Sequence, residues 1–286
     1  MFVDESYRRN VGYFVAEEWD EPGQQWFLVP QGAVFFLHLP VESYGLAYYA
    51  VTARHIVETT NSQTTKYAHT FLRVNTGNGN NARDWPVSYS DWIFHPTADV
   101  AVCKVVFLPN PNVFSMPFVA GFGQVVLGHD VFFVGLFDPV PGKEAVDAVV
   151  RFGRVAQPRA RVPIILNRFT EERHEADVHL VECISWGGES GSPVFFYEQQ
   201  YSVGGLPDSF SGESLRVTPS VRPGLLGLMH GHFPIEGANS GIAAVIPARE
   251  IHTTLMDRRL VEDREDMLQV AKTKQSKLGT PTPDVK

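Results

Sequence analysis

Cysteine is scarce in this chain: Cys103 and Cys183 are the only two among 286 residues. A scaffold held by several disulfides is therefore excluded, because two cysteines can form at most one bridge. The first fourteen residues, MFVDESYRRNVGYF, carry charged side chains where a signal peptide would have its apolar segment. We therefore expect a cytoplasmic protein whose two thiols are reduced.

Long apolar runs and blocks of basic residues are also missing. No run approaches the roughly eighteen apolar residues that mark a membrane-spanning helix. Lysine and arginine total 24 against 32 aspartates and glutamates, which gives a formal net charge of −8. A nucleic-acid-binding protein contacts phosphates through a basic face. We therefore expect neither nucleic acid nor a membrane among the partners.

Turn-forming and apolar residues are abundant, with 24 glycines, 20 prolines and 44% hydrophobic residues. Short β-rich runs such as GAVFFLHLP and DVFFVGLF lie on either side of a proline-rich connector, LPNPNVFSMPF, at 108–118. Two sets of about six strands predict an all-β protein of two antiparallel barrels or sandwiches. We place the first unit at 1–115, the second at 116–250, a C-terminal α-helix at 251–271 and a mobile tail at 272–286.

The segment 199–224 is long for a connection between two strands. It is rich in Gly, Ser and Pro, whereas a hairpin connection usually takes about two to five residues. We predict a mobile hairpin extension that serves as a docking or gating element for a regulatory protein partner. A solvated insertion without a role is the alternative.

The stretch SWGGESGSP, residues 185–193, places Ser190 between Gly188 and Gly191. A serine hydroxyl becomes a nucleophile when a base takes its proton, and acyl transfer also requires donors for the developing oxyanion. Glycine at 188 allows the backbone N–H groups to turn into a concavity beside Ser190, because no Cβ restricts φ. The stretch is consistent with a nucleophile, and an ordinary Ser-Gly loop is the alternative.

His55 and Asp99 are the candidates for the base and the carboxylate that holds it. His55 follows a β-rich run in YYAVTARHIVE, which places the imidazole at the rim of a sheet. Asp99 precedes an apolar run in HPTADVAVCKV, at the edge of a core. A solvated histidine at a strand end and an aspartate that caps a turn are the alternatives.

Together the motifs TARH at 52–55, DVAV at 99–102 and GESGSP at 188–193 resemble the signature blocks of trypsin-like serine proteases. Their order is that of the family, and their separations, 44 and 91 residues, are close to the family's. The resemblance covers about residues 10–255 and is nearest in style to bacterial glutamyl endopeptidases and high-temperature-requirement proteases. It implies a chymotrypsin-like fold of two antiparallel six-stranded β-barrels.

The resemblance also implies roles for these residues. Ser190 would be the nucleophile, His55 the general base and Asp99 the group that orients the imidazole, while the N–H groups of Gly188 and Ser190 would form the oxyanion hole. The chain has no Ile-Val-Gly-Gly start, so activation by a newly cut N-terminus beside Glu189 is not expected.

By the same resemblance, the primary specificity pocket would have its floor near Ile184 and one wall from Met229, His230, Gly231 and His232. Ile184 is not acidic, so we expect a preference for apolar or small side chains over Lys or Arg. His230 and His232, two residues apart, would share a face of a strand. Without a clustered carboxylate or cysteine we expect no metal there, and no cofactor.

The function predicted is that of an intracellular serine endopeptidase that forms an acyl-enzyme intermediate on a protein or peptide substrate. Two other functions stay open. One is a catalytically silent protease-fold protein that binds a partner, and the other is an esterase or acyl hydrolase that uses the same three residues. Intact His, Asp and Ser motifs argue against the silent form.

Overall fold

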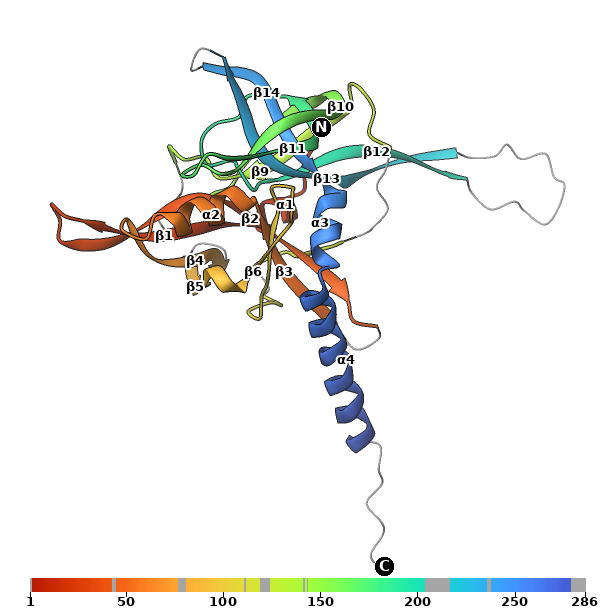
Figure 1. The fold of residues 1–286 in the computed structure, drawn as a ribbon. Coiled ribbons are helices and arrows are strands. Elements are labelled where there is room, and N and C mark those ends of the chain that lie inside the picture. Colours follow the sequence, from red (N-terminus) through yellow and green to blue (C-terminus); the bar gives the residue numbers. More distant parts are fainter. Residues whose placement is uncertain are drawn as a thin grey trace, which may run out of the picture.

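The computed structural model describes residues 2–42, 45–76, 81–110, 112–118, 124–140, 142, 144–203, 217–235 and 238–278. Strands dominate this part of the chain and form two units, with a helix leaving the body at the C-terminal end (Figure 1). The prediction of an all-β protein of two units is confirmed.

The first unit is one sheet of eight strands with the order β5-β4-β1-β2-β3-β7-β6, and β8 pairs with β2. Its strands are β1 (Val11–Asp20), β2 (Gln25–Pro40), β3 (Leu46–Thr52), β4 (Tyr67–Thr76), β5 (Asn81–Pro86), β6 (Trp92–Phe94), β7 (Ala101–Lys104) and β8 (Met116–Pro117). The sheet therefore has more strands than the six predicted. The unit also extends past residue 115, because the proline-rich connector supplies β8 as a short parallel edge strand.

The second unit is a closed six-stranded barrel, β10-β11-β14-β13-β12-β9, as predicted. Its strands are β9 (Asp130–Gly135), β10 (Val149–Asn167), β11 (Glu172–Glu182), β12 (Pro193–Val203), β13 (Val217–Ile235) and β14 (Ala238–Pro247). Phe133, Val194 and Met229 pack together inside it. A second apolar cluster includes Phe36 of β2 and Phe132 of β9, so the two units share a continuous core.

The β12–β13 hairpin replaces much of the long connection predicted at 199–224. The two strands stay paired out to Val203 and Val217, and they project from the barrel (Figure 1). The prediction of a hairpin extension is therefore confirmed for its arms. The predicted mobile docking element falls mainly on residues 204–216, which lie outside the described residues.

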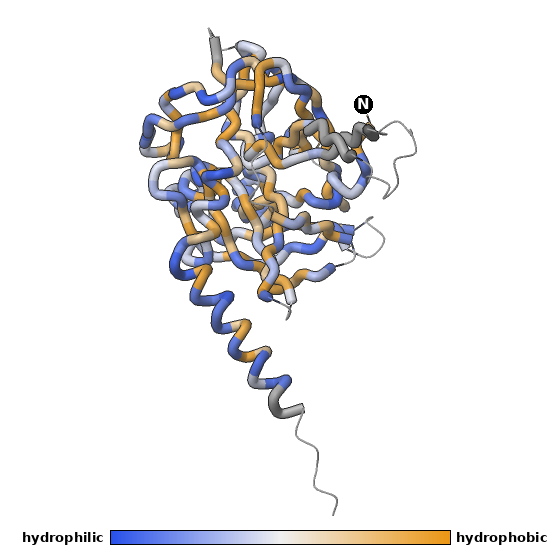
Figure 2. The backbone as a smooth tube through the Cα atoms, turned by 90° about the vertical axis from the view of Figure 1, so that its right-hand side faces the viewer, coloured by the Kyte–Doolittle hydropathy of each residue, from blue (hydrophilic) through white to orange (hydrophobic). Residues whose placement is uncertain are grey.

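Two helices, not one, follow the barrel: α3 (Ala248–Leu255) and α4 (Arg258–Leu278). Ile251 and Leu255 of α3 are fully buried. The predicted tail boundary at 272 is wrong, because α4 contains no glycine or proline and ends at Leu278, directly before Gly279. Figure 2 shows α4 leaving the body with mostly hydrophilic residues along its length. Within the described residues, no helix is both long and apolar enough to cross a membrane.

Candidate active site

His55 lies in the first turn of α2 (Arg54–Ser62), where the chain leaves β3. Ala53 is extended (φ −73°, ψ 133°), so the helix begins directly after it and His55 is held at the end of the sheet. An N–H in the first turn of a helix has no partner within the helix. The His55 backbone N–H instead donates to Asp99 Oδ1 at 2.7 Å.

Asp99 is fully buried between β6 and β7, and its second oxygen holds the His55 ring. His55 Nδ1 donates to Asp99 Oδ2 at 2.7 Å, which leaves Nε2 as the proton acceptor. Burial lowers the pKa of His55 to about 4, although the Asp99 charge and hydrogen bond oppose this. Burial would raise the pKa of Asp99, but the two histidines beside it hold that pKa below its ordinary value. At neutral pH the pair is a neutral imidazole and a carboxylate.

Ser190 lies in the turn between β11 and β12, and this turn is docked on the first unit. The Ala33 N–H of β2 donates to Ser190 O at 2.9 Å. Gly191 has φ +82°, and a Cβ there would lie 2.2 Å from Ala33 O and 2.5 Å from Thr52 Oγ1. Glycine is therefore required at 191 by both the backbone conformation and the close approach of β2 and β3.

The Ser190 hydroxyl donates to the His230 carbonyl oxygen at 2.8 Å. A hydroxyl has one proton to donate, and no His55–Ser190 hydrogen bond occurs among the described residues. His230 nevertheless contacts all three predicted residues. Its ring centroid is 5.1 Å from that of His55, its Nδ1 is 2.5 Å from Asp99 Oδ2, and its carbonyl holds Ser190.

The predicted oxyanion donors are the N–H groups of Gly188 and Ser190. Neither donates a hydrogen bond to another group in the described part of the chain. Gly188 has φ +88°, a conformation that turns the peptide out of a regular strand and favours glycine. The two N–H groups are thus available to an oxygen brought by a ligand.

Glu189 is buried and anchors the turn that carries these donors. It forms an ion pair with the Arg151 side chain of β10, and its Oε2 accepts the Trp186 N–H at 2.8 Å. Burial raises the pKa of Glu189 to about 7, although Trp186 and Arg151 both act to lower it. The cation that pairs with Glu189 is therefore the Arg151 side chain of the barrel and not a newly cut N-terminus.

His230 is placed differently from the prediction, which assigned it to a pocket wall. Its Nε2 accepts the Ile165 N–H at 3.4 Å, so the ring proton is on Nδ1, where it donates to Asp99. Asp99 Oδ2 therefore accepts from two imidazoles. His55, Asp99 and His230 are also the group of possible metal ligands within the described residues, with ligand atoms within 4.8 Å of one another. His232 is not part of that group.

The other predicted pocket residues are only partly brought together. Ile184 is 64% exposed, and Met229 is fully buried in the barrel core. Gly231 does face Ser190, since a Cβ there would lie 3.9 Å from Ser190 Oγ. His232 is half-buried. The cause is an irregularity in the β13–β14 pairing between Met229 and Gly231, where alternation of side chains cannot be counted.

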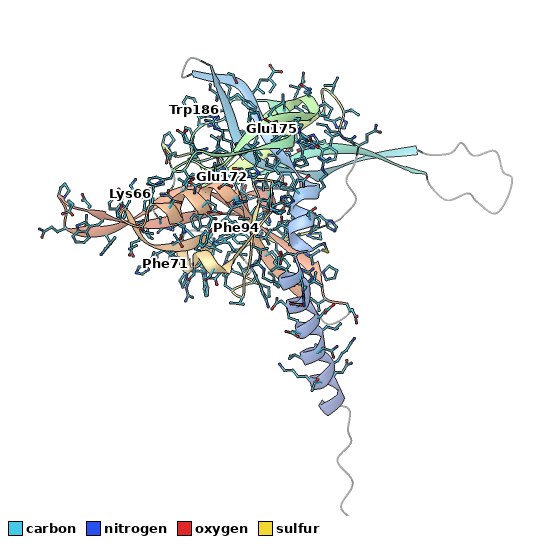
Figure 3. All side chains as sticks on the ribbon, in the orientation of Figure 1. Lys66, Phe71, Phe94, Glu172, Glu175 and Trp186 are labelled. Carbon is cyan, nitrogen blue, oxygen red and sulfur yellow. The ribbon has the colours of Figure 1, made fainter. Side chains whose placement is uncertain are left out.

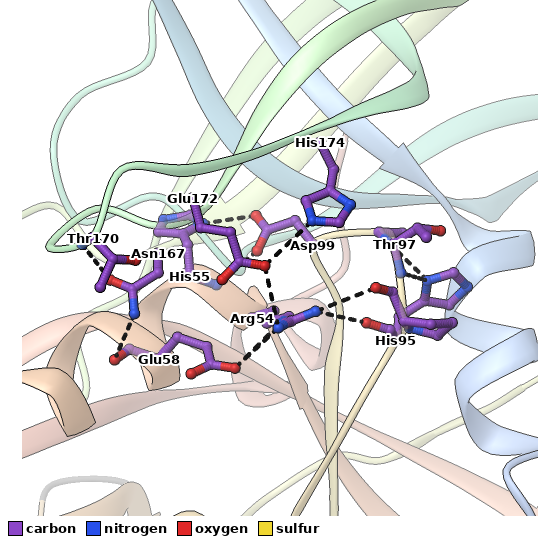
Figure 4. Close-up of polar contacts among 12 residues, drawn as sticks. Arg54, His55, Glu58, His95, Thr97, Asp99, Asn167, Thr170, Glu172 and His174 are labelled. Atoms are coloured by element: carbon purple, nitrogen blue, oxygen red, sulfur yellow. Dashed lines mark hydrogen bonds and ion pairs between the residues drawn. The ribbon is translucent and has the colours of Figure 1, made fainter.

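Two further charged groups lie beside the site, and the sequence reasoning gave them no role; Figure 4 shows the first, around Arg54. Arg54 pairs with Glu58 at 3.2 Å and with Glu172 at 3.8 Å. Figure 3 shows Glu172 at the level where the two units meet. Arg168, on the turn after β10, has Nη2 3.5 Å from Ser190 Oγ. Arg54 stands within the TARH motif, but the resemblance gave it no role, and no motif marks Arg168. Their contacts with Glu172 and Ser190 join distant segments.

Solved structures with a similar fold include the MamO protease domain of Magnetospirillum magneticum, with 17% identity, a TM-score of 0.50, and 88% of this chain and 98% of that chain covered. The Rv3671c protease of M. tuberculosis in its active form has 18% identity and a TM-score of 0.48, over 87% and 81% of the two chains. Tobacco etch virus protease with product has 9% identity and a TM-score of 0.45, over 91% and 84%.

No curated protein matches the chain in sequence. Residues 36–204 match the model of the trypsin-like peptidase domain. The matched segment is more than half of the chain and contains His55, Asp99 and Ser190. The chain therefore belongs to the trypsin-like peptidase family.

Proposed function

We propose that this protein is a serine endopeptidase that cleaves peptide bonds through an acyl-enzyme on Ser190. The observation that carries the proposal is the buried His55–Asp99 pair, with Nδ1 and Oδ2 at 2.7 Å, next to a serine on a glycine-lined turn. The pair leaves His55 Nε2 unprotonated and able to accept a proton at neutral pH.

The proposed reaction begins when the Ser190 hydroxyl rotates from the His230 carbonyl toward His55 Nε2. Ser190 Oγ attacks the scissile carbonyl carbon, and its proton passes to Nε2. The carbonyl oxygen becomes an oxyanion that accepts hydrogen bonds from the N–H groups of Gly188 and Ser190. The imidazolium, stabilised by Asp99, then gives the proton to the leaving amine as the C–N bond breaks.

Hydrolysis of the acyl-enzyme repeats these steps with water. His55 takes a proton from the water as its oxygen attacks the ester carbon, and returns a proton to Ser190 Oγ as the product acid leaves. No metal or cofactor enters this scheme, since the base, the nucleophile and the oxyanion donors are all groups of the chain.

A fluorophosphonate probe and a peptide-cleavage assay test the proposal together. The wild-type protein should be labelled and should cleave a peptide library, whereas Ser190→Ala should lose both. Ser192→Ala is the matched control, because Ser192 is buried two residues away and its Oγ has no hydrogen-bond partner. Labelling of Ser190 without any peptide cleavage would favour an acyl hydrolase, and no labelling would favour a silent binding protein.

We further propose that the protein works in the cytoplasm and that a protein partner regulates it. Two free, buried thiols, Cys103 and Cys183, support a reducing compartment, which cell fractionation would test. The projecting β12–β13 hairpin supports a docking role. Replacing residues 204–216 by Asn-Gly keeps the Val203–Val217 pairing and should abolish regulation by the partner while cleavage of small peptides continues.

A further inference from the structure

The turn between β10 and β11 is fixed to the helix that carries His55. Asn167, the last residue of β10, is buried, and its Nδ2 donates to Ser62 Oγ at 2.9 Å. The Arg168 N–H donates to Thr59 Oγ1 at 2.9 Å. Asn167 Oδ1 accepts the Phe169 N–H at 2.9 Å, which closes the turn on itself; Figure 4 shows Asn167 between this turn and Glu58. Arg168 is thus mounted on the same rigid support as the base.

The Arg168 guanidinium reaches the nucleophile from this support. Its Nη2 is 3.5 Å from Ser190 Oγ and 3.8 Å from the position of a Cβ on Gly231. Arg168 as a residue keeps access to solvent. A ligand held by Ser190 would therefore lie within reach of a fixed positive charge.

No protein carboxylate forms an ion pair with Arg168 in the part of the chain that the structure describes. Glu58 of α2 pairs with Arg54, and Glu172 of β11 pairs with Arg54 and His174. Asp99 is held by His55 and His230. Within the described residues, no ion pair joins Arg168 to a carboxylate, and its side chain hydrogen-bonds the neutral Ser190 hydroxyl. Asp99 interacts with the guanidinium only through space, without a hydrogen bond to it.

We propose that Arg168 is a specificity-determining residue that binds an Asp or Glu side chain of the substrate close to the scissile bond. The inference rests on the proposed function and names the substrate class: acidic peptides. A planar guanidinium matches a carboxylate through two parallel hydrogen bonds. The arginine keeps its charge at every pH at which the enzyme would work. An acidic side chain of the substrate would form with the Arg168 guanidinium the ion pair that it lacks within the described residues.

The test is cleavage of a peptide library by the purified full chain, read by mass spectrometry, followed by matched peptides that differ only by Glu against Gln at the preferred position. Wild-type protein should favour Glu by about 10- to 100-fold in kcat/KM, as expected for a hydrogen bond between charged groups. Arg168→Gln should bring the ratio near one, Arg168→Lys should keep part of it, and Arg168→Glu should favour Lys-containing peptides.

Arg173→Gln is the control, because Arg173 is an exposed arginine on the same hairpin and should leave the ratio unchanged. The inference is overturned if the wild-type protein shows no preference for the Glu peptide, or if Arg168→Gln keeps that preference. It is also overturned if Arg168→Gln lowers kcat/KM for the Glu and the Gln peptide by the same factor. Cleavage that survives Ser190→Ala would refute the proposed function itself, and the inference with it. Ser190-dependent cleavage without a charge preference refutes only the role of Arg168.

Discussion

Glu189 and Arg151 form the buried ion pair behind the serine turn, and they predict that activity and stability change in opposite directions with pH. Glu189 is 1% exposed, and burial raises its pKa from 4.5 to about 7. Protonation removes the charge that binds Arg151, so the turn with Gly188 and Ser190 loses its anchor. We therefore expect kcat/KM to fall as the pH drops through about 7.

The free energy of unfolding should rise as the pH falls, in contrast to kcat/KM, because the pKa of Glu189 is raised in the folded state. Near pH 6 the folded protein binds nearly one proton more at Glu189 than the unfolded chain does, because that pH lies between the two pKa values. With pKa values of about 7 and 4.5, linkage gives an increase of about 2.5 kcal/mol in the free energy of unfolding from pH 8 to pH 5. The stabilisation is complete only below 4.5 and is lost as the pH rises through 7.

His55 cannot account for an acid limb near pH 7, because its pKa is about 4. The assay is kcat/KM from pH 5 to 9 on a peptide without titrating groups, beside urea unfolding at the same pH values. Glu189→Gln should abolish the acid limb, so that kcat/KM stays, at every pH, near the low value that the wild-type protein reaches in acid. Arg151→Gln should move the limb to higher pH, because the carboxylate then lacks its cation.

Arg154→Gln is the control for these variants, since Arg154 lies on the same strand in an exposed pair with Asp130. It should leave both profiles unchanged. An acid limb near pH 4, or a limb that stays in place in Arg151→Gln, would refute the role of the ion pair.

Three further predictions concern the triad and the thiols. Asp99→Asn should lower kcat by about 10⁴-fold because it stabilises the wrong imidazole tautomer; a loss below tenfold in steady-state kinetics would count against the carboxylate's role. His230→Ala should raise the pKa of His55, because His230 acts to lower it; NMR titration of the His55 ring checks this, and an unchanged pKa would contradict it. Cys103 and Cys183 are free, and burial raises the pKa of each thiol to about 12, so they should react with a thiol reagent only after unfolding. Fast reaction of the native protein would be the contrary result.

The three motif residues could be predicted from the sequence because each stands in a short local pattern. His55 follows the end of a strand, Asp99 precedes one, and Ser190 occupies a glycine turn. In this order and spacing the motifs resemble those of trypsin-like serine proteases, and that resemblance predicts the fold family. The second barrel's six strands followed from the same alternation of apolar runs and turns.

The surroundings of His55, Asp99 and Ser190 could not be predicted, because they depend on register between distant strands. Arg151 reaches Glu189 from β10, which pairs Arg151 with Phe133. His230 reaches Asp99 because the β13–β14 register shifts beside it, which also buries Met229. The first sheet exceeded its predicted strand count for a similar reason, since β8 is defined only by its pairing with β2.

The charges gathered around Ser190 explain why an acidic substrate would find a favourable site in a chain with a net charge of −8. Each buried acid of the site is already matched: Asp99 accepts two imidazole N–H groups, and Glu189 faces Arg151. Glu189 is therefore paired with a cation, whereas the Asp99 charge is stabilised by hydrogen bonds and also acts through space on Arg168. The distant surface acids act through solvent and are screened beyond about 8 Å at physiological salt. The potential at Ser190 is therefore set mainly by the contacts within hydrogen-bond range, and among these Arg168 is the cation that forms no ion pair with a carboxylate in the described part of the chain.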